Sequence, residues 1–242
     1  MKILFDEEMA FSEHIEEFSQ RFIFCLIYFF FTTIIFITKI NEIVKLFQAP
    51  AIGIKFLQFA PGEYFLVSVK ITVFCGILFS SPTIIYQLLL YVIPGLTKNE
   101  RNIVLPISLG SIGLFFLGLM FSYFLLIPAA LKFFIAYSSD IVEPIWSFDK
   151  YFDFVAVLSF ATGLAFQVPA IQVILGLLDV FTGEKMLSAW KYLIVICTIV
   201  AAIITPSTDP ITQTLLSVAL LSLYLSGSGL VILFKKTSLN KK

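Results

Sequence analysis

The sequence predicts an all-α integral membrane protein with six transmembrane helices and both termini on the inner side of the membrane. Of its 242 residues, 59% are hydrophobic and only 13% are charged, whereas a soluble domain carries about 25% charged residues. So few polar groups cannot cover a surface that faces water, but a helix surrounded by lipid does not need them. Six apolar stretches separated by polar segments give the number of spans.

The six stretches differ in length. A helix rises about 1.5 Å per residue, so about 20 residues cross a hydrocarbon core about 30 Å thick. We expect short fifth and sixth spans. Because the fifth reaches only roughly 20 Å, a re-entrant or buried helix is the alternative there. The expected spans, within one polytopic membrane domain over residues 1–242, are 22–38, 67–93, 103–127, 152–178, 192–204 and 215–234.

Positive charges and prolines predict the orientation and shape of the bundle. Lys and Arg are more frequent in the segments that face inward when the N-terminus is inside, which is the bias that orients membrane proteins. Pro82 and Pro169 fall within expected spans, where a proline removes a backbone hydrogen bond and bends the helix. A curved, cupped bundle is therefore expected.

The first outer loop, residues 39–65, is expected to hold a short amphipathic helix on the outer surface. Ile40, Val44 and Phe47 recur at helical spacing shortly before Pro50. A later outer loop contains Trp146, a residue type that favours the membrane–water interface. These loops are therefore more than plain linkers.

Composition excludes several kinds of site. The 16 basic and 16 acidic residues balance, so no bulk attraction to nucleic acid is expected. The three cysteines lie in apolar runs without a Cys or His companion, which argues against a disulfide framework or a metal site. The single histidine argues against a bis-histidine haem or a zinc site. We expect no metal and no cofactor.

A polar stripe precedes the first span. His14, Glu17 and Arg21 follow one another at i, i+3 and i+7 beside an apolar face, which predicts an amphipathic helix along the inner interface. Two interpretations of Glu17 stay open. It pairs with Arg21 at i, i+4, a contact worth a few tenths of a kcal/mol, or it presents its carboxylate to a cationic ligand.

A second acidic residue, Glu100, is expected on the same membrane face as Glu17. With Thr97 it fits a T-x-x-E capping box that opens the third span, and this role alone would explain it. Two acids at similar depth could also bind two basic side chains. A guanidinium binds a carboxylate bidentately and is poorly replaced by lysine.

Two more polar residues lie near expected helix breaks. Gln167 is deep in the fourth span, two residues before Pro169. Its amide should hydrogen-bond to a neighbouring helix or a ligand, or else to the carbonyl that the proline frees. Asp209 is followed by Pro210, a good N-cap and first-turn pair for the sixth span.

Taken in order, these motifs resemble the TatC family, the large multi-span subunit of the twin-arginine (Sec-independent) protein translocase. The resemblance covers nearly the whole chain. Two further segments, 128–134 and 146–152, look especially like the cyanobacterial and chloroplast branch, and the 28 Phe residues fit a plastid-encoded protein. The motifs are His14-x-x-Glu17-x-x-x-Arg21, Pro50, Tyr91-x-x-Pro94-Gly95-Leu96-x-x-x-Glu100-Arg101, Phe166-x-Val168-Pro169 and Thr205-Pro206-x-x-Asp209-Pro210-x-x-Gln213.

The resemblance implies a receptor without catalysis. Such a subunit binds Arg-Arg signal peptides of folded cargo and assembles TatA-like and TatB-like single-span partners, as a homo-oligomer within a receptor complex, for transport driven by the proton-motive force. It implies the thylakoid membrane with both termini in the stroma, or alternatively a bacterial inner membrane. Gln167 is an implied contact with a partner or peptide, and Pro50, Asp209 and Gln213 are implied loop residues. The implied signal-peptide site comprises Glu17, Glu100, His14, Arg21, Tyr91, Pro94, Lys98 and Arg101.

Two positions depart from the family pattern. Many members carry a second basic residue before the first span, where this chain has Ser19. Many bacterial members have Glu where this chain has Gln167. Because an amide does not titrate, we expect no obligatory proton step at that position.

Two other functions remain as alternatives. A secondary transporter for a small solute would need buried charges at mid-membrane and paired discontinuous helices, and no inverted repeat is visible in the sequence. An electron-transfer or intramembrane enzyme subunit would need more histidines or an acidic pair at a helix centre. The sequence favours neither.

Overall fold

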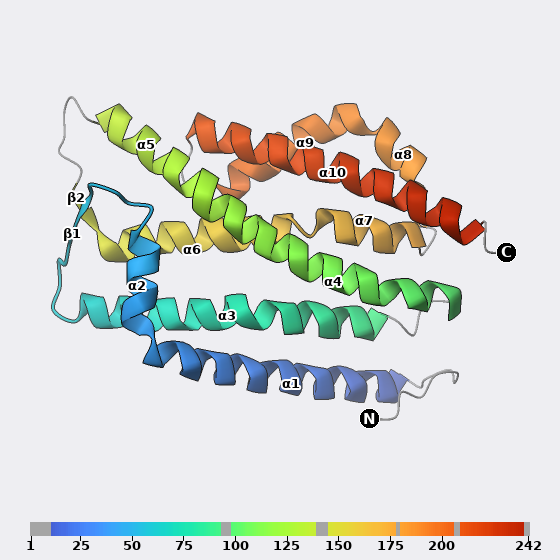
Figure 1. Cartoon of the computed structure of the whole chain (residues 1–242), viewed down its shortest axis with the longest axis horizontal. Coiled ribbons are helices and arrows are strands. Elements are labelled where there is room, and N and C mark those ends of the chain that lie inside the picture. The colour runs from blue at the N-terminus through green and yellow to red at the C-terminus, as the bar shows by residue number, and fades with distance from the viewer. Residues whose placement is uncertain (1–10, 93–97, 139–144, 178–179, 206–208, 240–242) are drawn as a thin grey trace.

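The computed structural model describes residues 11–92, 98–138, 145–177, 180–205 and 209–239. Long helices run beside one another along the long axis of the molecule (Figure 1). Five segments of the described chain are long and apolar enough to cross a membrane, and a shorter apolar helix adds to them. The five segments are Ile15–Thr38, Glu63–Leu88, Leu109–Ser138, Phe148–Gly176 and Pro210–Leu233.

The first two spans are each a single helix. Helix α1 covers Phe11–Thr38, so the expected amphipathic segment and the first span form one continuous helix. Helix α3 covers Glu63–Val92 and continues through Pro82. The two helices pack along each other. The rings of Phe36 and Phe79 lie 4.7 Å apart between centroids.

The third span is built from three segments. Helix α4 covers Lys98–Phe121, a π-helical turn covers Ser122–Leu126, and α5 covers Ile127–Ser138. The helical path therefore extends beyond the end expected at residue 127. A π turn widens the hydrogen-bonding interval to i, i+5, and it commonly occurs as one bulge within a longer helix.

The fourth span is interrupted in its middle. Helix α6 covers Phe148–Ala165 and α7 covers Val168–Leu177, so the break falls at Phe166 and Gln167. Pro169 has no N–H to donate to the Ala165 carbonyl four residues earlier, and its ring crowds that carbonyl. The helix therefore breaks between Ala165 and Val168, and Pro169 falls in the first turn of α7, where the missing N–H is tolerated.

The fifth and sixth spans form a hairpin of unequal helices. Helix α8 covers Gly183–Ser188 and α9 covers Trp190–Ile204, and α9 is the short apolar helix. Helix α10 covers Pro210–Leu239 and has 30 residues. The expectation of a short sixth span is therefore wrong, because the helix starts at its proline and continues past the apolar stretch at its C-terminal end.

The two ends of the bundle differ in construction. Helices α1 and α4 begin at one end of the bundle, and α10 finishes at the same end. We call it the site end (Figure 1). The opposite end, which we call the cap end, carries α2 (Ile40–Gln48) and strands β1 (Lys55–Leu57) and β2 (Ile145–Ser147). Helix α9 ends and helix α10 begins short of the cap end in this view.

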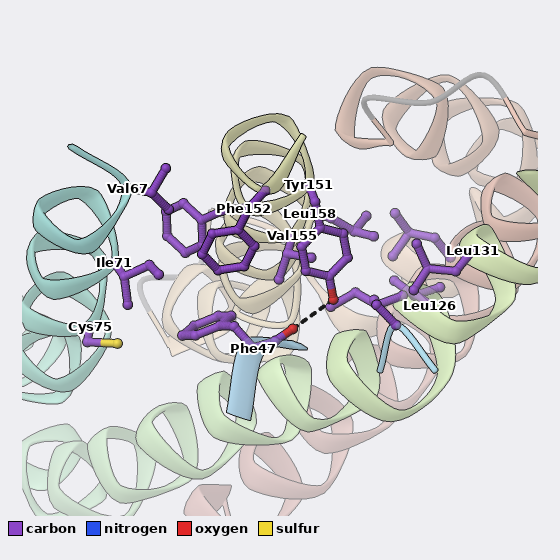
Figure 2. Packing of buried hydrophobic residues seen from close by; sticks show 14 of the residues in the cluster. Phe47, Val67, Ile71, Cys75, Leu126, Leu131, Tyr151, Phe152, Val155 and Leu158 are labelled. Carbon is purple, nitrogen blue, oxygen red and sulfur yellow. Dashed lines mark hydrogen bonds between the residues drawn. The ribbon is translucent and has the colours of Figure 1, made fainter. Parts of the chain in front are cut away.

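The expected amphipathic helix after the first span is α2, and its apolar face packs inward. Val44 and Phe47 are buried within the main hydrophobic core. The Phe47 ring meets Phe152 of α6 edge to face, with centroids 5.4 Å apart. Figure 2 shows Phe47 and Phe152 with the Tyr151 hydroxyl, which donates a 2.7 Å hydrogen bond to the backbone carbonyl of Phe47.

Two features of the cap end were not foreseen in the sequence. Strands β1 and β2 pair in parallel, with Phe56 opposite Trp146. Lys70 of α3 forms salt bridges of 2.6 Å to Asp149 and 2.9 Å to Asp153 of α6. Together with the core around α2, these contacts tie the outer loops to the second and fourth spans.

Candidate functional site

The carboxylate of Glu17 lies at the site end and is already paired within its own helix. Arg21 donates to its Oε1 from both Nε, at 3.0 Å, and Nη2. The Arg21 Nη1 donates a 2.8 Å hydrogen bond to Gln87 Oε1 of α3. The side chains are 22% exposed for Glu17 and 14% for Arg21. The i, i+4 pair expected from the spacing therefore forms, and it links α1 to α3.

The second carboxylate oxygen of Glu17 remains available for bonding. Among the residues that the structure describes, Glu17 Oε2 has no hydrogen-bond partner, and it is screened from solvent. A screened, unpaired carboxylate oxygen is costly, because the lost hydration is not replaced. An incoming donor would therefore gain more at this atom than at an exposed acid.

Aromatic rings of α1 and α3 pack against one another next to this ion pair. Phe18 stacks on Phe22 with ring centroids 6.3 Å apart, and it meets the Tyr91 ring edge to face at 5.6 Å. Tyr91 belongs to the last turn of α3. The structure thus brings together three predicted site residues, Glu17, Arg21 and Tyr91, through contacts between α1 and α3.

The other predicted site residues are placed only in part. Helix α4 begins at Lys98 at the site end, so Glu100 belongs to its first turn (Figure 1). The side chains of Lys98, Glu100 and Arg101 lie outside the described residues, as do Pro94 and Thr97. His14 belongs to α1, but its side chain also lies outside the description. A shared site of Glu17 and Glu100 stays a prediction.

Gln167 is bound entirely to a neighbouring helix. Its Oε1 accepts a 2.8 Å hydrogen bond from Ser111 Oγ of α4, and its Nε2 donates to the Ser111 backbone carbonyl at 3.1 Å. The sequence left open a hydrogen bond to a neighbouring helix, to a ligand or to the carbonyl freed by Pro169. These contacts match the first interpretation. The amide fastens the break between α6 and α7 to the third span.

The loop residues named by the sequence have structural partners. Asp209 is 1% exposed, and its Oδ2 accepts a 2.8 Å hydrogen bond from the Thr212 backbone N–H. It is therefore the expected N-cap of α10. Gln213 Nε2 donates to the Thr198 carbonyl of α9 at 3.4 Å. Pro50 lies half-buried just after α2.

Gln87 is the site residue that the sequence reasoning missed. It is a lone polar residue in the apolar run from Ile84 to Leu90, four residues before Tyr91. On a helix, i and i+4 lie on one face, so the motif that contains Tyr91 could have pointed to Gln87. Within the described part of the chain, no cluster of three His, Cys, Asp or Glu side chains could hold a metal ion.

The fold and the site define a multi-pass α-helical membrane protein whose charged side chains gather at the two ends of the bundle. Comparison with known proteins then gives the family. The family described as Sec-independent protein translocase protein (TatC) matches residues 13–218. The chain belongs to this family.

Relatives and solved structures agree with this assignment. The chain is 53% identical to the tatC-like protein ycf43 of Porphyra purpurea over 96% of this chain and 91% of the relative. It is 48% identical to the TatC protein of Synechocystis over 96% and 91% of the two chains. The chloroplastic TATC of Pisum sativum is 46% identical, over 93% of this chain and 65% of its own length.

A crystal structure of the twin-arginine translocase receptor TatC superposes on the chain with a TM-score of 0.76 and 32% sequence identity. The match covers 90% of this chain and 99% of that one. A second structure of the receptor, in DDM, gives a TM-score of 0.78 at 33% identity and covers 90% and 98%. The fold therefore holds over almost the whole length of the solved receptor.

Proposed function

We propose that this chain is a non-enzymatic receptor and core subunit of a Sec-independent translocase in the thylakoid membrane. In this role it binds the Arg-Arg signal peptides of folded precursor proteins. The observation that carries the proposal is the Glu17 carboxylate near the start of α1, one oxygen of which is screened from solvent and has no hydrogen-bond partner among the residues that the structure describes. The family membership and the similarity to solved structures of the twin-arginine translocase receptor TatC support it.

The chemistry of the site favours arginine over lysine in the ligand. A guanidinium carries five donors in a planar fork and can bridge carboxylate oxygens, whereas an ammonium is a strongly hydrated point charge. Glu17 supplies one acceptor, and Glu100, in the first turn of α4, supplies the second in this proposal. His14, Lys98, Arg101, Tyr91 and Pro94 complete the proposed surroundings of the peptide.

The proposed assembly includes TatA-like and TatB-like single-span partners and further copies of this chain. Both termini would face the stroma, and the proton-motive force would drive transport. The exposed apolar faces of α1 and α9 leave lipid-facing surface in a single copy, and such surface admits partner helices by close packing.

The test is crosslinking from the two acidic positions. With a photo-crosslinking residue beside Glu17 or Glu100, a twin-arginine peptide should be captured and a twin-lysine version should not. Glu17→Gln or Glu100→Gln should abolish capture while the protein stays inserted. Glu16→Gln is the matched control, because Glu16 is exposed on the same turn. Normal capture in both acidic variants would overturn the proposal.

A further inference from the structure

The third and fourth spans each lose the regular helical pattern, and the two irregular points touch. The third span contains the π turn Ser122–Leu126, and the fourth is interrupted at Phe166 and Gln167 between α6 and α7 (Figure 1). The Phe121 ring, directly before the π turn, and the Phe166 ring have centroids 5.5 Å apart. Helices bend at π turns and at prolines, and Pro169 closely follows the interruption. Both spans can therefore bend at one shared level.

The hydrophobic packing divides at this same level. From the third span, the main cluster takes buried residues of the π turn and of α5, whereas a second cluster takes Ile107 of α4. From the fourth span, the main cluster takes residues of α6, and the second takes Ala170 and Val173 of α7 beside Met186 of α8. We call α5, α6 and the helices α2 and α3 that pack with them the cap body, and α4, α7 and α8 the site body. The π turn and the interruption lie on the boundary between these two bodies.

Two contacts between α4 and the cap body lie close to the bending level. Gly118 approaches the fourth span so closely that an added Cβ would lie 3.0 Å from the Gly163 Cα. Phe116 meets Phe79 of α3 edge to face, with ring centroids 6.3 Å apart. Both of these α4 residues lie within about 9 Å of the π turn along the helix axis. Contacts so near a pivot shift little when the helix bends, so they join the two bodies without fixing the far end of α4.

The sixth span crosses the boundary between the two bodies. Leu216 and Leu220 of α10 pack in the main cluster, and Val231 packs in the second. Between these two contributions lies the run Ser226-Gly227-Ser228-Gly229. Helices bend at pairs of Gly and Ser. The sixth span can therefore follow a movement of the site body without breaking either cluster.

The two acidic residues of the proposed site belong to different bodies. Helix α3 packs in the main cluster, and Arg21 Nη1 ties α1 to it through a 2.8 Å hydrogen bond to Gln87, so Glu17 belongs with the cap body. Glu100 is in the first turn of α4, in the site body. Helix α4 is about 35 Å long, so a bend of about 10° at the π turn moves its first residue by about 6 Å. The distance between residues 17 and 100 therefore depends on the bend.

We propose that the receptor closes on its ligand by bending at this level, so that the start of α4 moves toward α1. The proposal rests on the function proposed above, in which an arginine pair binds both acids. A ligand shifts such an equilibrium only when it binds one shape better than the other. Two guanidinium groups that contact both carboxylates meet this condition, because they reach both acids together only when α4 has moved in. Bending at a few helix positions between packed bodies is a common form of closure around a ligand.

Distances between pairs of spin labels test the closure. Genetically encoded labels at Ser19 of α1 and Asn99 of α4 report on the site end, and labels at Lys45 and Lys150, both exposed, report on the cap end. Pulsed electron paramagnetic resonance on the full chain in lipid nanodiscs compares each pair with and without a saturating twin-arginine peptide. We expect the 19–99 distance to shorten by about 3–6 Å, which corresponds to a bend of about 5–10°. The distance between the labels at the cap end should not change.

Two proline variants locate the bend. Pro169→Ala restores an N–H that can donate to the Ala165 carbonyl, so that α6 and α7 can join as one helix. Because the closed shape is then populated less, we expect a smaller change in the 19–99 distance and about tenfold weaker peptide binding. Pro82→Ala is the control, because α3 already continues through Pro82 and the Ser81 hydroxyl donates a 2.6 Å hydrogen bond to the Leu78 carbonyl that this proline leaves free. It should behave like the unchanged chain.

The outcomes separate the closure from the receptor function. Peptide capture at positions 17 and 100 with an unchanged 19–99 distance would overturn the closure and leave the receptor function intact. Equal distance changes in Pro169→Ala and Pro82→Ala would also overturn it, because the bend would then not depend on the interruption of the fourth span. The labelled chain with its own prolines gives the first of these results even if Pro169→Ala fails to insert. Absence of peptide capture at both acidic positions would overturn the function itself.

Discussion

The guanidinium of Arg21 already bonds to one oxygen of Glu17, the carboxylate that is proposed to bind an arginine of the signal peptide. Arg21 is held on the other side by Gln87. A bound peptide must share Glu17 with Arg21 or displace it. The chain's own arginine therefore acts as a weak competitor, and its position between α1 and α3 sets how much of the carboxylate is open.

Arg21→Gln tests this competition. A partly exposed i, i+4 ion pair contributes about 0.3–1 kcal/mol, so its removal should raise the affinity for a twin-arginine peptide about two- to fivefold. Equilibrium binding of a labelled peptide to membranes measures it. Weaker binding in a fully inserted Arg21→Gln protein would show instead that Arg21 orients Glu17 for the peptide.

Close helix contacts determine how the third and fourth spans meet. At Gly118 of α4, an added Cβ would lie 3.0 Å from the Gly163 Cα and 2.9 Å from the Phe166 ring of the fourth span. Beyond this contact, Ser122 and Ser159 hydroxyls lie 3.2 Å apart, and Gln167 bonds to Ser111. Small and polar residues at such a contact let two helices approach each other in lipid.

Gly118→Ala should therefore destabilise the protein. Overpacking a tight contact costs about 1–3 kcal/mol. Gly113→Ala on the same helix is the control, because nothing lies within 4 Å of the added Cβ, and alanine favours a helix. Thermal unfolding in detergent compares the two. Equal unfolding temperatures would mean that the third and fourth spans accommodate the added methyl group without a loss of stability.

The two ends of the molecule are held together in different ways. At the cap end, α2, β1, β2, α3 and α6 are joined by core packing, strand pairing and the contacts of Lys70 (Figure 1). Toward the site end, the described contacts include the Arg21 links, the Phe18 and Tyr91 rings, and a second hydrophobic cluster that joins α4, α7, α8 and α10. The proposed signal-peptide site therefore lies at the opposite end of the bundle from α2 and the strands.

Tyr151→Phe probes the cap end. The change keeps the ring and removes the hydroxyl that donates to the buried Phe47 carbonyl. Leaving that acceptor unpaired should cost about 1–3 kcal/mol, whereas Tyr137→Phe, at an 82% exposed position, should cost nothing measurable. Unfolding in detergent measures both, and peptide capture at the site end should persist in both variants. Equal stability of the two variants would mean that the Tyr151 hydroxyl does not stabilise the cap end.

The sequence predicts what is local in this fold and little of what is not. Hydropathy located the long helices, and spacing predicted the Glu17–Arg21 pair and the Asp209 cap, because each depends on neighbours within a few turns. The pairing of β1 with β2 and of Lys70 with Asp149 joins residues about 80 to 90 positions apart. The hydrophobic periodicity of one segment gives no information about its contacts with a segment so far away in the sequence. Gln87 was missed because one polar residue barely changes the hydropathy of a span.

The parallel pairing of β1 and β2 also determines when the cap end can form during synthesis of the chain. A chain made from its N-terminus releases α1, α2, β1 and α3 before residue 145 exists. Until then Lys70 has neither of its aspartates, and Phe47 lacks Phe152. Long-range contacts of this kind form slowly because the loop between them must first close. The cap end is therefore completed late in biogenesis, whereas the packing of α1 against α3 can form as soon as the first two spans meet.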